Sequence, residues 1–406
     1  MSSGPPVAVI LALGLTQIIG YGTLYYSFSI LAPDMARDLG WSVDWVFGLL
    51  SASLFLSGLT APFAGRLMDR FGAGRVMTLG SFAAALSLML CALAPHRAVF
   101  VAGLLLTELS ANLVQYGAAF ALLVEIRPRE AQRSITYLTL IAGFASTIFW
   151  PVTSLLHGAL TWQAVYMVFA GLNLVLCLPL HAWLSLYGRG GRHAPDHSVD
   201  SAGPVPGLLA ERVRQKGFRL MLSGIGILSF VNAALLFHMV PVLSDLGLGA
   251  AAVLVATLFG PAQVLSRFTN MIFGRNLGAL QLAVLTALFA PLSILVLELT
   301  YPFTPGAMLF AVIFGFGSGL SSIVFGTLPL ALFGSEGYGA RQGQISLVRL
   351  AASALSPFGL AVILQRAGPD MVLWSLIGLG LVALCFFIAL SRLGQVGPAS
   401  QAGQVR

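Results

Sequence analysis

Charged residues are scarce in this chain, and their scarcity excludes most soluble proteins. Aspartate, glutamate, lysine and arginine make up 9% of the 406 residues, whereas 58% are hydrophobic. A soluble protein of this length carries about a quarter charged residues, so there is too little polar surface to cover a water-soluble globule. The apolar runs exceed about 20 residues and do not alternate, which favours helices over a membrane barrel. We therefore predict an all-α integral membrane protein.

Lysine is almost absent, and so is any nucleotide-binding motif. Lys216 is the only lysine, and no G-x-x-x-x-G-K phosphate loop occurs. The chain therefore has no recognisable ATP site, and an electrochemical or solute gradient is the expected energy source. The formal net charge is +7, but the basic residues lie in loops between apolar runs, where they set membrane orientation. We expect no nucleic-acid partner.

Cysteine is rare, and catalytic motifs are missing. Cys91, Cys177 and Cys385 are far apart inside apolar runs, a spacing that indicates neither a zinc site nor a disulfide framework. Neither G-x-S-x-G nor H-E-x-x-H occurs in the sequence. We expect no enzyme activity, no catalytic residue, no metal and no cofactor.

Twelve apolar stretches are long enough to cross a bilayer. They cover approximately residues 7–32, 45–63, 76–95, 98–125, 134–157, 162–186, 218–243, 249–272, 278–299, 306–333, 343–365 and 370–392. Basic residues gather in the even-numbered loops, whereas the odd-numbered loops hold only Arg37, Arg97 and Arg366. By the positive-inside rule, both termini are cytoplasmic. We expect a monomer embedded in the lipid bilayer.

The longest polar segment divides these stretches into two equal groups. We therefore assign residues 1–186 and 218–392 to two six-helix bundles, 187–217 to a cytoplasmic central loop and 393–406 to a cytoplasmic tail. A weak internal repeat supports the division, because RDLG follows the first stretch and SDLG follows the seventh. Repeated halves with a site between them are common in secondary transporters.

One carboxylate lies near the middle of the fourth stretch. Glu108 occupies a depth at which an ionised side chain is expensive, and at helical spacing it shares a face with Asn112, Gln115 and Tyr116. This polar stripe predicts a role in proton coupling or substrate contact. A structural carboxyl, hydrogen-bonded to a neighbouring helix, is the alternative.

Further polar residues extend the predicted substrate and proton pathway. Arg349 lies about 9 Å inside the eleventh stretch, at ~1.5 Å per residue, so it could bind an anionic substrate, pair with an acid or extend to the interface. Gln17, Tyr21 and Tyr25 follow one face of the first stretch, where they could line a cavity or pack against neighbours. Asn232 adds an amide in the seventh stretch.

The loop after the second stretch carries the most specific motif. It reads G-x-x-x-D-R-x-G-x-x-R over Gly65, Asp69, Arg70, Gly72 and Arg75. In this position it resembles the loop between the second and third helices of the major facilitator superfamily (MFS) of secondary transporters, with a generic basic loop as the alternative. The resemblance covers essentially the whole chain. It implies the MFS fold, in which two pseudo-symmetric six-helix bundles open a central cavity alternately to each side of the membrane.

The resemblance also implies a role for the motif. In this family the aspartate, Asp69 here, typically contacts an arginine of the same loop and the cytoplasmic start of the eleventh helix, near Gly343 and Gln344. A negative charge is favourable at a helix N-terminus, so the contact would hold the cytoplasmic side closed. The first, fourth, seventh and tenth spans are expected to line the cavity.

Three stretches are similar to one bacterial branch of the family. They are GLTQIIGYGTLYYSFS from Gly14, GFASTIFWP from Gly143 and CLPLH from Cys177, and the branch includes proteins implicated in efflux of trivalent arsenicals. We expect a secondary transporter of the bacterial inner membrane that exports a small solute by alternating access, coupled to protons. Arsenite or antimonite efflux, organic-anion transport through Arg349 and a non-transporting membrane sensor are the alternatives.

Overall fold

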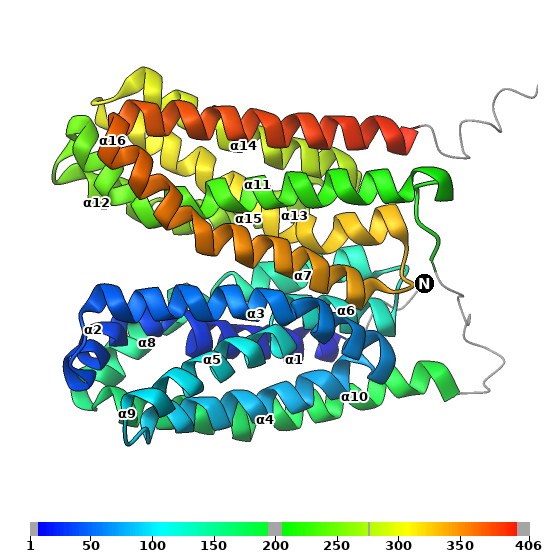
Figure 1. Ribbon diagram of the computed structural model, residues 1–406. Helices are drawn as coiled ribbons and strands as arrows, with labels where there is room; N and C mark the ends of the chain where they lie inside the picture. The colour runs from blue at the N-terminus through cyan, green and yellow to red at the C-terminus, as the bar shows by residue number, and fades with distance from the viewer. Residues whose placement is uncertain (1–6, 194–204, 275–276, 396–406) are drawn as a thin grey trace, which may run out of the picture. The chain divides into compact units, whose positions relative to one another are not determined.

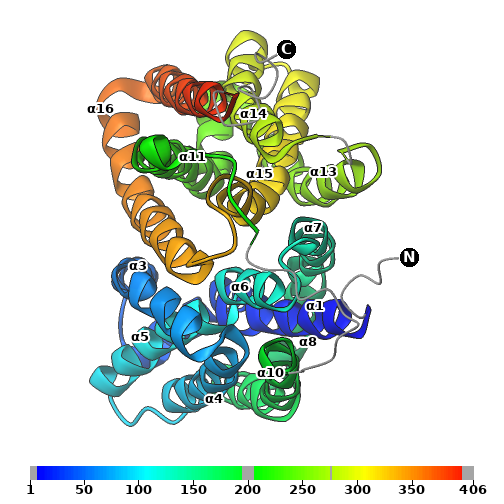
Figure 2. The ribbon, with the colours of Figure 1, turned by 90° about the vertical axis from the view of Figure 1, so that its right-hand side faces the viewer.

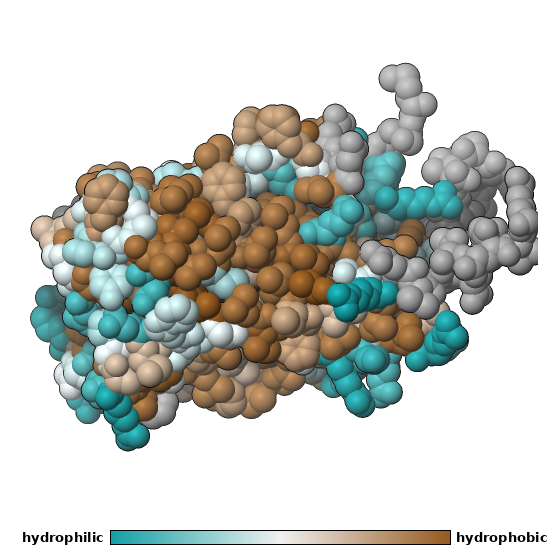
Figure 3. All heavy atoms as spheres, turned by 90° about the horizontal axis from the view of Figure 1, so that it is seen from above, coloured by the Kyte–Doolittle hydropathy of each residue, from teal (hydrophilic) through white to brown (hydrophobic). Residues whose placement is uncertain are grey.

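The computed structural model describes residues 7–193, 205–274 and 277–395, and most of them are helical (Figure 1). Eleven helices within these residues are long and apolar enough to cross a membrane. On the face shown in Figure 3, hydrophobic side chains gather in the middle and hydrophilic ones toward both ends, a distribution suited to a bilayer. The predicted all-α membrane fold is confirmed.

The final helix covers both of the last two predicted spans. α16 (Tyr338–Gln395) contains 58 residues and is interrupted at Gly368, where φ is 80° and ψ is 176°. This positive φ, which glycine adopts readily, falls between the predicted spans 343–365 and 370–392. In Figure 1 the orange and red parts of α16 run in clearly different directions. The count of eleven membrane-crossing helices in the described residues is therefore compatible with twelve spans.

The helices cluster into two compact units. One comprises Met1–Val205 with Ser335–Leu350, and the other comprises Pro206–Gly334 with Ala351–Arg406. The start of α16 thus belongs with the N-terminal helices, although the sequence places it in the C-terminal bundle. The physical reason is hydrogen bonding between this segment and α3 (Val43–Phe71).

The first unit contains the following helices and two π-helical turns. They are α1 (Val7–Tyr21), η1 (Gly22–Tyr26), α2 (Phe28–Leu39), α3, α4 (Ala73–Ala92), α5 (Arg97–Val114), α6 (Tyr116–Ile126), α7 (Ala131–Ala142), α8 (Ala145–Ala159), α9 (Trp162–Leu172), η2 (Asn173–Cys177) and α10 (Leu178–His193). Helix α4 lies against α5, α9 and α10, and α1 lies against α7 and α8 (Figure 2). Leu31, Phe100 and Phe169 belong to the hydrophobic core between α2, α4, α5 and α9.

Several predicted spans of this unit are interrupted. The first span widens into η1 and the sixth into η2. These two turns are joined by a buried hydrogen bond of 2.9 Å, in which Asn173 Nδ2 donates to Thr23 Oγ1. The fourth span breaks at Gln115, whose extended backbone separates α5 from α6. Wide turns and breaks of this kind are frequent at functional sites.

The second unit is arranged around a glycine-rich helix. Its elements are α11 (Glu211–Leu243), η3 (Ser244–Leu248), α12 (Ala251–Thr257), α13 (Phe259–Phe273), α14 (Ala279–Thr300), α15 (Thr304–Phe333) and the part of α16 from Ala351. Helix α15 lies against both α13 and α14. The buried Arg267 of α13 donates from Nε to the Gly319 carbonyl of α15 at 3.3 Å, which satisfies part of its donor capacity within the unit.

Candidate functional site

Asp69 holds the beginning of α16 against the end of α3. Its Oδ1 accepts a hydrogen bond from the Gly339 amide and its Oδ2 accepts one from the Ala340 amide, each at 2.8 Å. These amides belong to the first turn of α16, where the helix leaves its N–H groups without internal partners. The carboxylate therefore satisfies two donors and places negative charge at a helix N-terminus. Helix α16 begins at Tyr338, five residues before the predicted span.

Small residues allow α3 and α16 to approach closely enough for this contact. A Cβ on Gly65 would collide with the Gly339 carbonyl, and a Cβ on Gly339 would lie 2.6 Å from Asp69 Oδ1. A Cβ on Gly343 would likewise collide with the Ala61 carbonyl. Ala61 and Gly65 on α3 thus face Gly339 and Gly343 on α16, a pairing of small residues four apart on each helix. Gly339 was not among the predicted gate residues, although its spacing of four from Gly343 is visible in the sequence.

The remainder of the motif ends α3 and begins α4. Gly72 ends α3 with a φ of 90°, and the next amide, that of Ala73, donates to Glu125 Oε2 at 2.9 Å. Glu125 therefore caps α4, a role that no local sequence signal predicts because 52 positions separate it from Ala73. Arg75 is exposed, and the exposed Arg70 places its guanidinium 5.0 Å from the centre of the Phe71 ring.

The pairing of Asp69 with an arginine of its own loop, which the resemblance implied, is not formed. Among the residues that the structure describes, the polar contacts of Asp69 are the two amides of α16. Both carboxylate oxygens are therefore already engaged by backbone donors.

Glu108 and Asn112 of α5 both reach Ser57 of α3. Ser57 Oγ donates to the backbone carbonyl of Glu108 at 2.6 Å, and Asn112 Nδ2 lies 2.7 Å from both the carbonyl and the hydroxyl oxygen of Ser57. Glu108 is only 4% exposed. Its carboxylate oxygen Oε1 is buried and has no hydrogen-bond partner in the described residues. A buried acceptor without a donor is unusual in a folded protein.

Gln17 donates a hydrogen bond at the point where the fourth span is interrupted. At Gln115 the Ala118 amide donates to the Gln115 carbonyl, so the helical ladder leaves the Val114 carbonyl without its usual donor. Gln17 Nε2 donates to that carbonyl at 2.7 Å, across α1 and α5. Gln17 is 1% exposed. It therefore has a structural duty in addition to its predicted place in the pathway.

The π-helical turn in the first span gathers tyrosine rings. The rings of Tyr21 and Tyr26 lie 6.4 Å apart, centre to centre, and Tyr21 lies 4.8 Å from Tyr116 of α6. Tyr25 lies 5.3 Å from Tyr26. Arg349 of α16, which belongs to the same unit, lies within electrostatic range of Tyr21, Tyr116 and Tyr25. These residues form one cluster within the first unit.

The predicted pathway residues are thus partly brought together. Tyr21, Tyr25 and Arg349 share the tyrosine cluster, and Tyr25 also lies within the electrostatic range of Glu108. Gln115 contributes the backbone break. Asn232 lies half-buried on α11. Helix α11 belongs to the second unit, whereas the tyrosine cluster belongs to the first.

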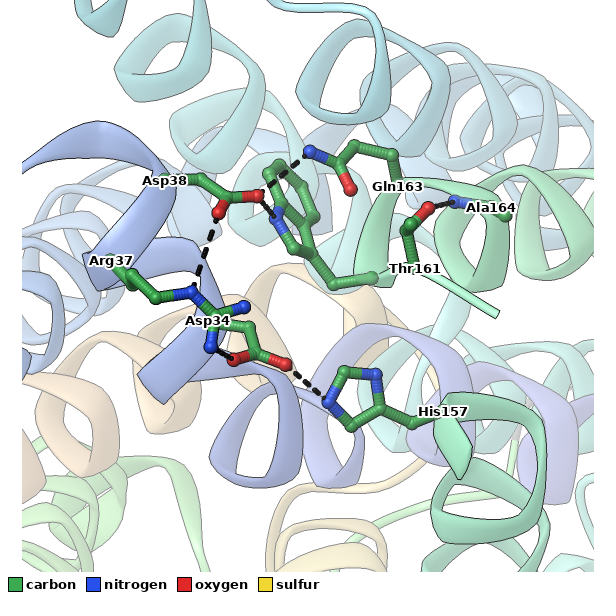
Figure 4. A network of polar contacts seen from close by, with 8 residues as sticks. Asp34, Arg37, Asp38, His157, Thr161, Gln163 and Ala164 are labelled. Carbon is green, nitrogen blue, oxygen red and sulfur yellow. Dashed lines mark hydrogen bonds and ion pairs between the residues drawn. The ribbon is translucent and has the colours of Figure 1, made fainter. Parts of the chain in front are cut away.

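A second polar network joins α2 to α8 and α9 (Figure 4). His157 Nε2 of α8 contacts Asp34 Oδ2 of α2 at 2.6 Å, and Arg37 NH1 contacts Asp34 Oδ1 at 2.7 Å. Asp38 Oδ2 accepts hydrogen bonds from the side chains of Trp162 and Gln163 on α9. The network ties the end of the first span to the fifth and sixth spans. Within the described residues, no three His, Cys, Asp or Glu side chains are grouped to hold a metal ion.

Comparison with known proteins places this arrangement in context. A model of the Major Facilitator Superfamily matches residues 13–357. Multidrug resistance protein MdtL from Klebsiella pneumoniae (strain 342) is 27% identical over 209 residues, which make up 50% of this chain and 51% of that protein. The match to this curated relative therefore spans about half of the relative's length.

Two solved structures share the fold. The human organic anion transporter MFSD10 (TETRAN) has a TM-score of 0.69 at 16% identity, with 94% of this chain and 100% of that chain covered. The proton:xylose symporter XylE, bound to 6-bromo-6-deoxy-D-glucose, has a TM-score of 0.69 at 12% identity, with 95% and 96% covered. At these identities the similarity establishes the fold alone.

Proposed function

The chain belongs to the major facilitator superfamily, and from that premise we propose that it exports a small solute across a bacterial inner membrane in exchange for protons. Family membership makes the protein a multi-pass secondary transporter rather than an enzyme. The proposal concerns the solute, the direction of transport and the coupling ion. The export direction is supported by the similarity to a multidrug resistance protein.

The carboxyl group of Glu108 supports proton coupling. It lies inside a membrane-spanning helix, and its Oε1 is buried without a hydrogen-bond donor in the described residues. A carboxylate that is costly at this depth can alternate between charged and neutral forms as water reaches it from one side or the other. The alternative role, a structural carboxyl bonded to a neighbouring helix, does not account for Oε1, because Ser57 bonds to the backbone of Glu108 instead.

The contact between Asp69 and α16 supports a gate. Two charge-assisted hydrogen bonds and a glycine-lined crossing hold α16 to α3. If both termini are cytoplasmic, as the loop charges predict, this contact lies on the cytoplasmic side. Its formation and rupture would then accompany the alternation of access.

The other candidate functions have less support. For arsenical efflux, Cys91 and Cys177 are buried and Cys385 is exposed, all as free thiols, so that alternative rests on the resemblance of three short stretches. A non-transporting sensor has no supporting feature in the described residues. We further propose that the protein acts as a monomer.

The coupling proposal is tested in everted membrane vesicles from an efflux-deficient bacterium. A growth panel of arsenite, antimonite, cationic dyes and aromatic carboxylates first identifies a solute against which the protein protects. That solute should then discharge the pH gradient of vesicles that contain the wild-type protein, as reported by a pH-sensitive dye. We expect Glu108→Gln to abolish the discharge, because the amide cannot carry a proton.

The matched control is Asp44→Asn, which removes an exposed carboxylate in the first turn of α3. It should discharge the gradient as the wild type does. Undiminished discharge by Glu108→Gln would contradict the assignment of the proton carrier. Failure of the wild-type protein to protect against any panel member would contradict export of these classes of solute.

A further inference from the structure

The end of the central loop is hydrogen-bonded to the end of α15. The Leu208 amide donates to the Ala331 carbonyl at 2.9 Å. The Leu209 amide donates to the Leu332 carbonyl at 3.1 Å. Both carbonyls belong to the last turn of α15, where a helix leaves its C=O groups without internal donors. The loop therefore supplies donors that the helix end lacks.

The same segment pairs with the residues that follow α15. Pro206 and Gly334 form an antiparallel bridge, which places Val205 opposite Ser335. The Ser335 amide donates to the Val205 carbonyl at 3.1 Å, and the Val205 amide donates to Ser335 Oγ at 3.0 Å. These four hydrogen bonds join residues 205–209, which we call the strap, to residues 331–335.

Close packing fixes the position of the strap. A Cβ on Gly207 would collide with the Leu332 carbonyl oxygen and lie 2.5 Å from the Phe333 carbonyl carbon, so the two backbones touch at this glycine. Leu209 is 2% exposed. A Cβ on Gly217 of α11 would lie 2.5 Å from Leu209 Cδ1, so the leucine side chain packs against α11. The strap therefore lies between the end of α15 and the beginning of α11.

The first turns of α11 hold the strap from their side. Arg214 Nε donates to the Leu209 carbonyl at 3.2 Å. Phe218 of α11 lies edge to face with Phe333 of α15, with the ring centres 5.4 Å apart. Both helices belong to the second unit. The strap thus joins the ends of two membrane-spanning helices that are far apart in the sequence.

The strap also coincides with two places where the chain passes from one unit to the other. One boundary falls between Val205 and Pro206, and another falls between Gly334 and Ser335. Because Pro206 pairs with Gly334 and Val205 with Ser335, the two passages lie on adjacent rungs of one short ladder. A loop that merely tethered two halves would need no such bonds, since a long flexible loop has only a small entropic cost.

We propose that the strap stays closed throughout the transport cycle and makes the adjoining ends of α11 and α15 move as one body. Moving either end alone would leave the carbonyl of Leu332, a residue that is 0% exposed, without its donor. The loop charges predict that both ends are cytoplasmic. This assignment rests on transport by alternating access, and it depends on neither the solute nor the coupling ion.

The first test is amide hydrogen exchange in the purified full-length protein, measured by mass spectrometry. A closed strap should make Leu208 and Leu209 exchange about 100-fold or more slowly than the same amides in an unstructured peptide. Gly207→Ala should speed this exchange about fivefold, which corresponds to the loss of one ordinary hydrogen bond. The control is Gly260→Ala, because a Cβ at this glycine of α13 meets nothing within 4 Å. It should exchange as the wild type does.

A milder variant keeps this test decisive if Gly207→Ala does not fold. Ser335→Ala removes only the acceptor of the Val205 amide, so it should speed exchange at Val205 about fivefold. Unprotected amides at Leu208 and Leu209 in the wild type would overturn the proposal, because the segment would then be a slack tether.

The second test is a disulfide between the two chain passages. Directly opposed residues of an antiparallel pair have Cα atoms about 5.5 Å apart, which is within reach of a disulfide. Val205→Cys with Ser335→Cys, in a Cys385→Ser background, should therefore cross-link on oxidation. The cross-linked protein should discharge the pH gradient in the vesicle assay as fully as its reduced form, and oxidised Val205→Cys alone serves as the control.

Inhibition by the cross-link that a reductant relieves would show that the strap has to open, and the proposal would be wrong. Hydrogen exchange needs neither a solute nor a pH gradient. Its outcome therefore stands whether or not the protein exports any member of the growth panel, so the two proposals can fail separately.

Discussion

Gln17 supplies a donor to the Val114 carbonyl, which the break at Gln115 removes from the helical ladder. Replacing Gln17 by leucine keeps a similar volume but leaves this buried carbonyl without a donor, at a cost of about 1–3 kcal/mol. We therefore expect the unfolding temperature of purified Gln17→Leu to fall by about 2 °C or more in a fluorescence-monitored melt. The control is Gln163→Leu, whose amide bonds to Asp38 at the protein surface. Equal unfolding temperatures of Gln17→Leu and Gln163→Leu would contradict this role of Gln17.

Single residues differ in how far the sequence reveals their roles. Glu108 could be singled out because a carboxylate in an apolar run is rare and expensive. The neighbours of Arg349 could not be named, because its electrostatic interaction with Tyr21 joins segments more than 300 positions apart and leaves no local signal. The hydrogen bond of Gln17 could not be predicted either, since it depends on a backbone break in another helix.

At the scale of elements, the crossing of α3 and α16 depends on glycine. Alanine at Gly339 would place a Cβ 2.6 Å from Asp69 Oδ1, so α16 must move away and both hydrogen bonds must lengthen. An exposed charge at a helix N-terminus contributes about 0.3–1 kcal/mol. We therefore expect amide hydrogen exchange at residues 339–340 to rise about threefold in Gly339→Ala, and solute export to change.

A control on the same helix separates this effect from a loss of helix propensity. A Cβ on Gly378 meets nothing within 4 Å, so Gly378→Ala should leave exchange at residues 339–340 as in the wild type. Asp69→Asn, which removes the charge while keeping the shape, should change exchange in the same direction as Gly339→Ala. Unchanged exchange in both Asp69→Asn and Gly339→Ala would show that the two hydrogen bonds do not hold the start of α16.

The existence of the membrane-spanning elements could be predicted, whereas their interruptions could not. A span needs a long apolar run, and such runs are visible in the sequence. The π-helical turn η1 and the break at Gln115 lie inside uniformly apolar stretches, where hydrophobic periodicity does not distinguish them from regular helix. They follow from packing, as the buried Asn173–Thr23 hydrogen bond shows.

At the scale of the whole molecule, the order of spans and the family followed from the sequence, because both depend on patterns repeated along the chain. The grouping of Ser335–Leu350 with the N-terminal helices did not follow from it. That grouping depends on contacts such as Asp69 with Gly339, which are 270 positions apart. Apolar patterning records which segments enter the membrane, but it does not record which of them bind to one another.

The orientation of the molecule decides on which side the Asp69 contact would act. The basic residues of the even-numbered loops predict that the loop holding Arg75 is cytoplasmic and that the loop holding His96 faces the opposite side. In a Cys385→Ser background, chosen because Cys91 and Cys177 are buried, a membrane-impermeant maleimide should label His96→Cys in intact cells. It should label Arg75→Cys only after the cells are permeabilised, because both positions are exposed but on different sides. The reverse pattern would place the contact between α3 and α16 on the outer side, and the proposed cytoplasmic gate would then be wrong.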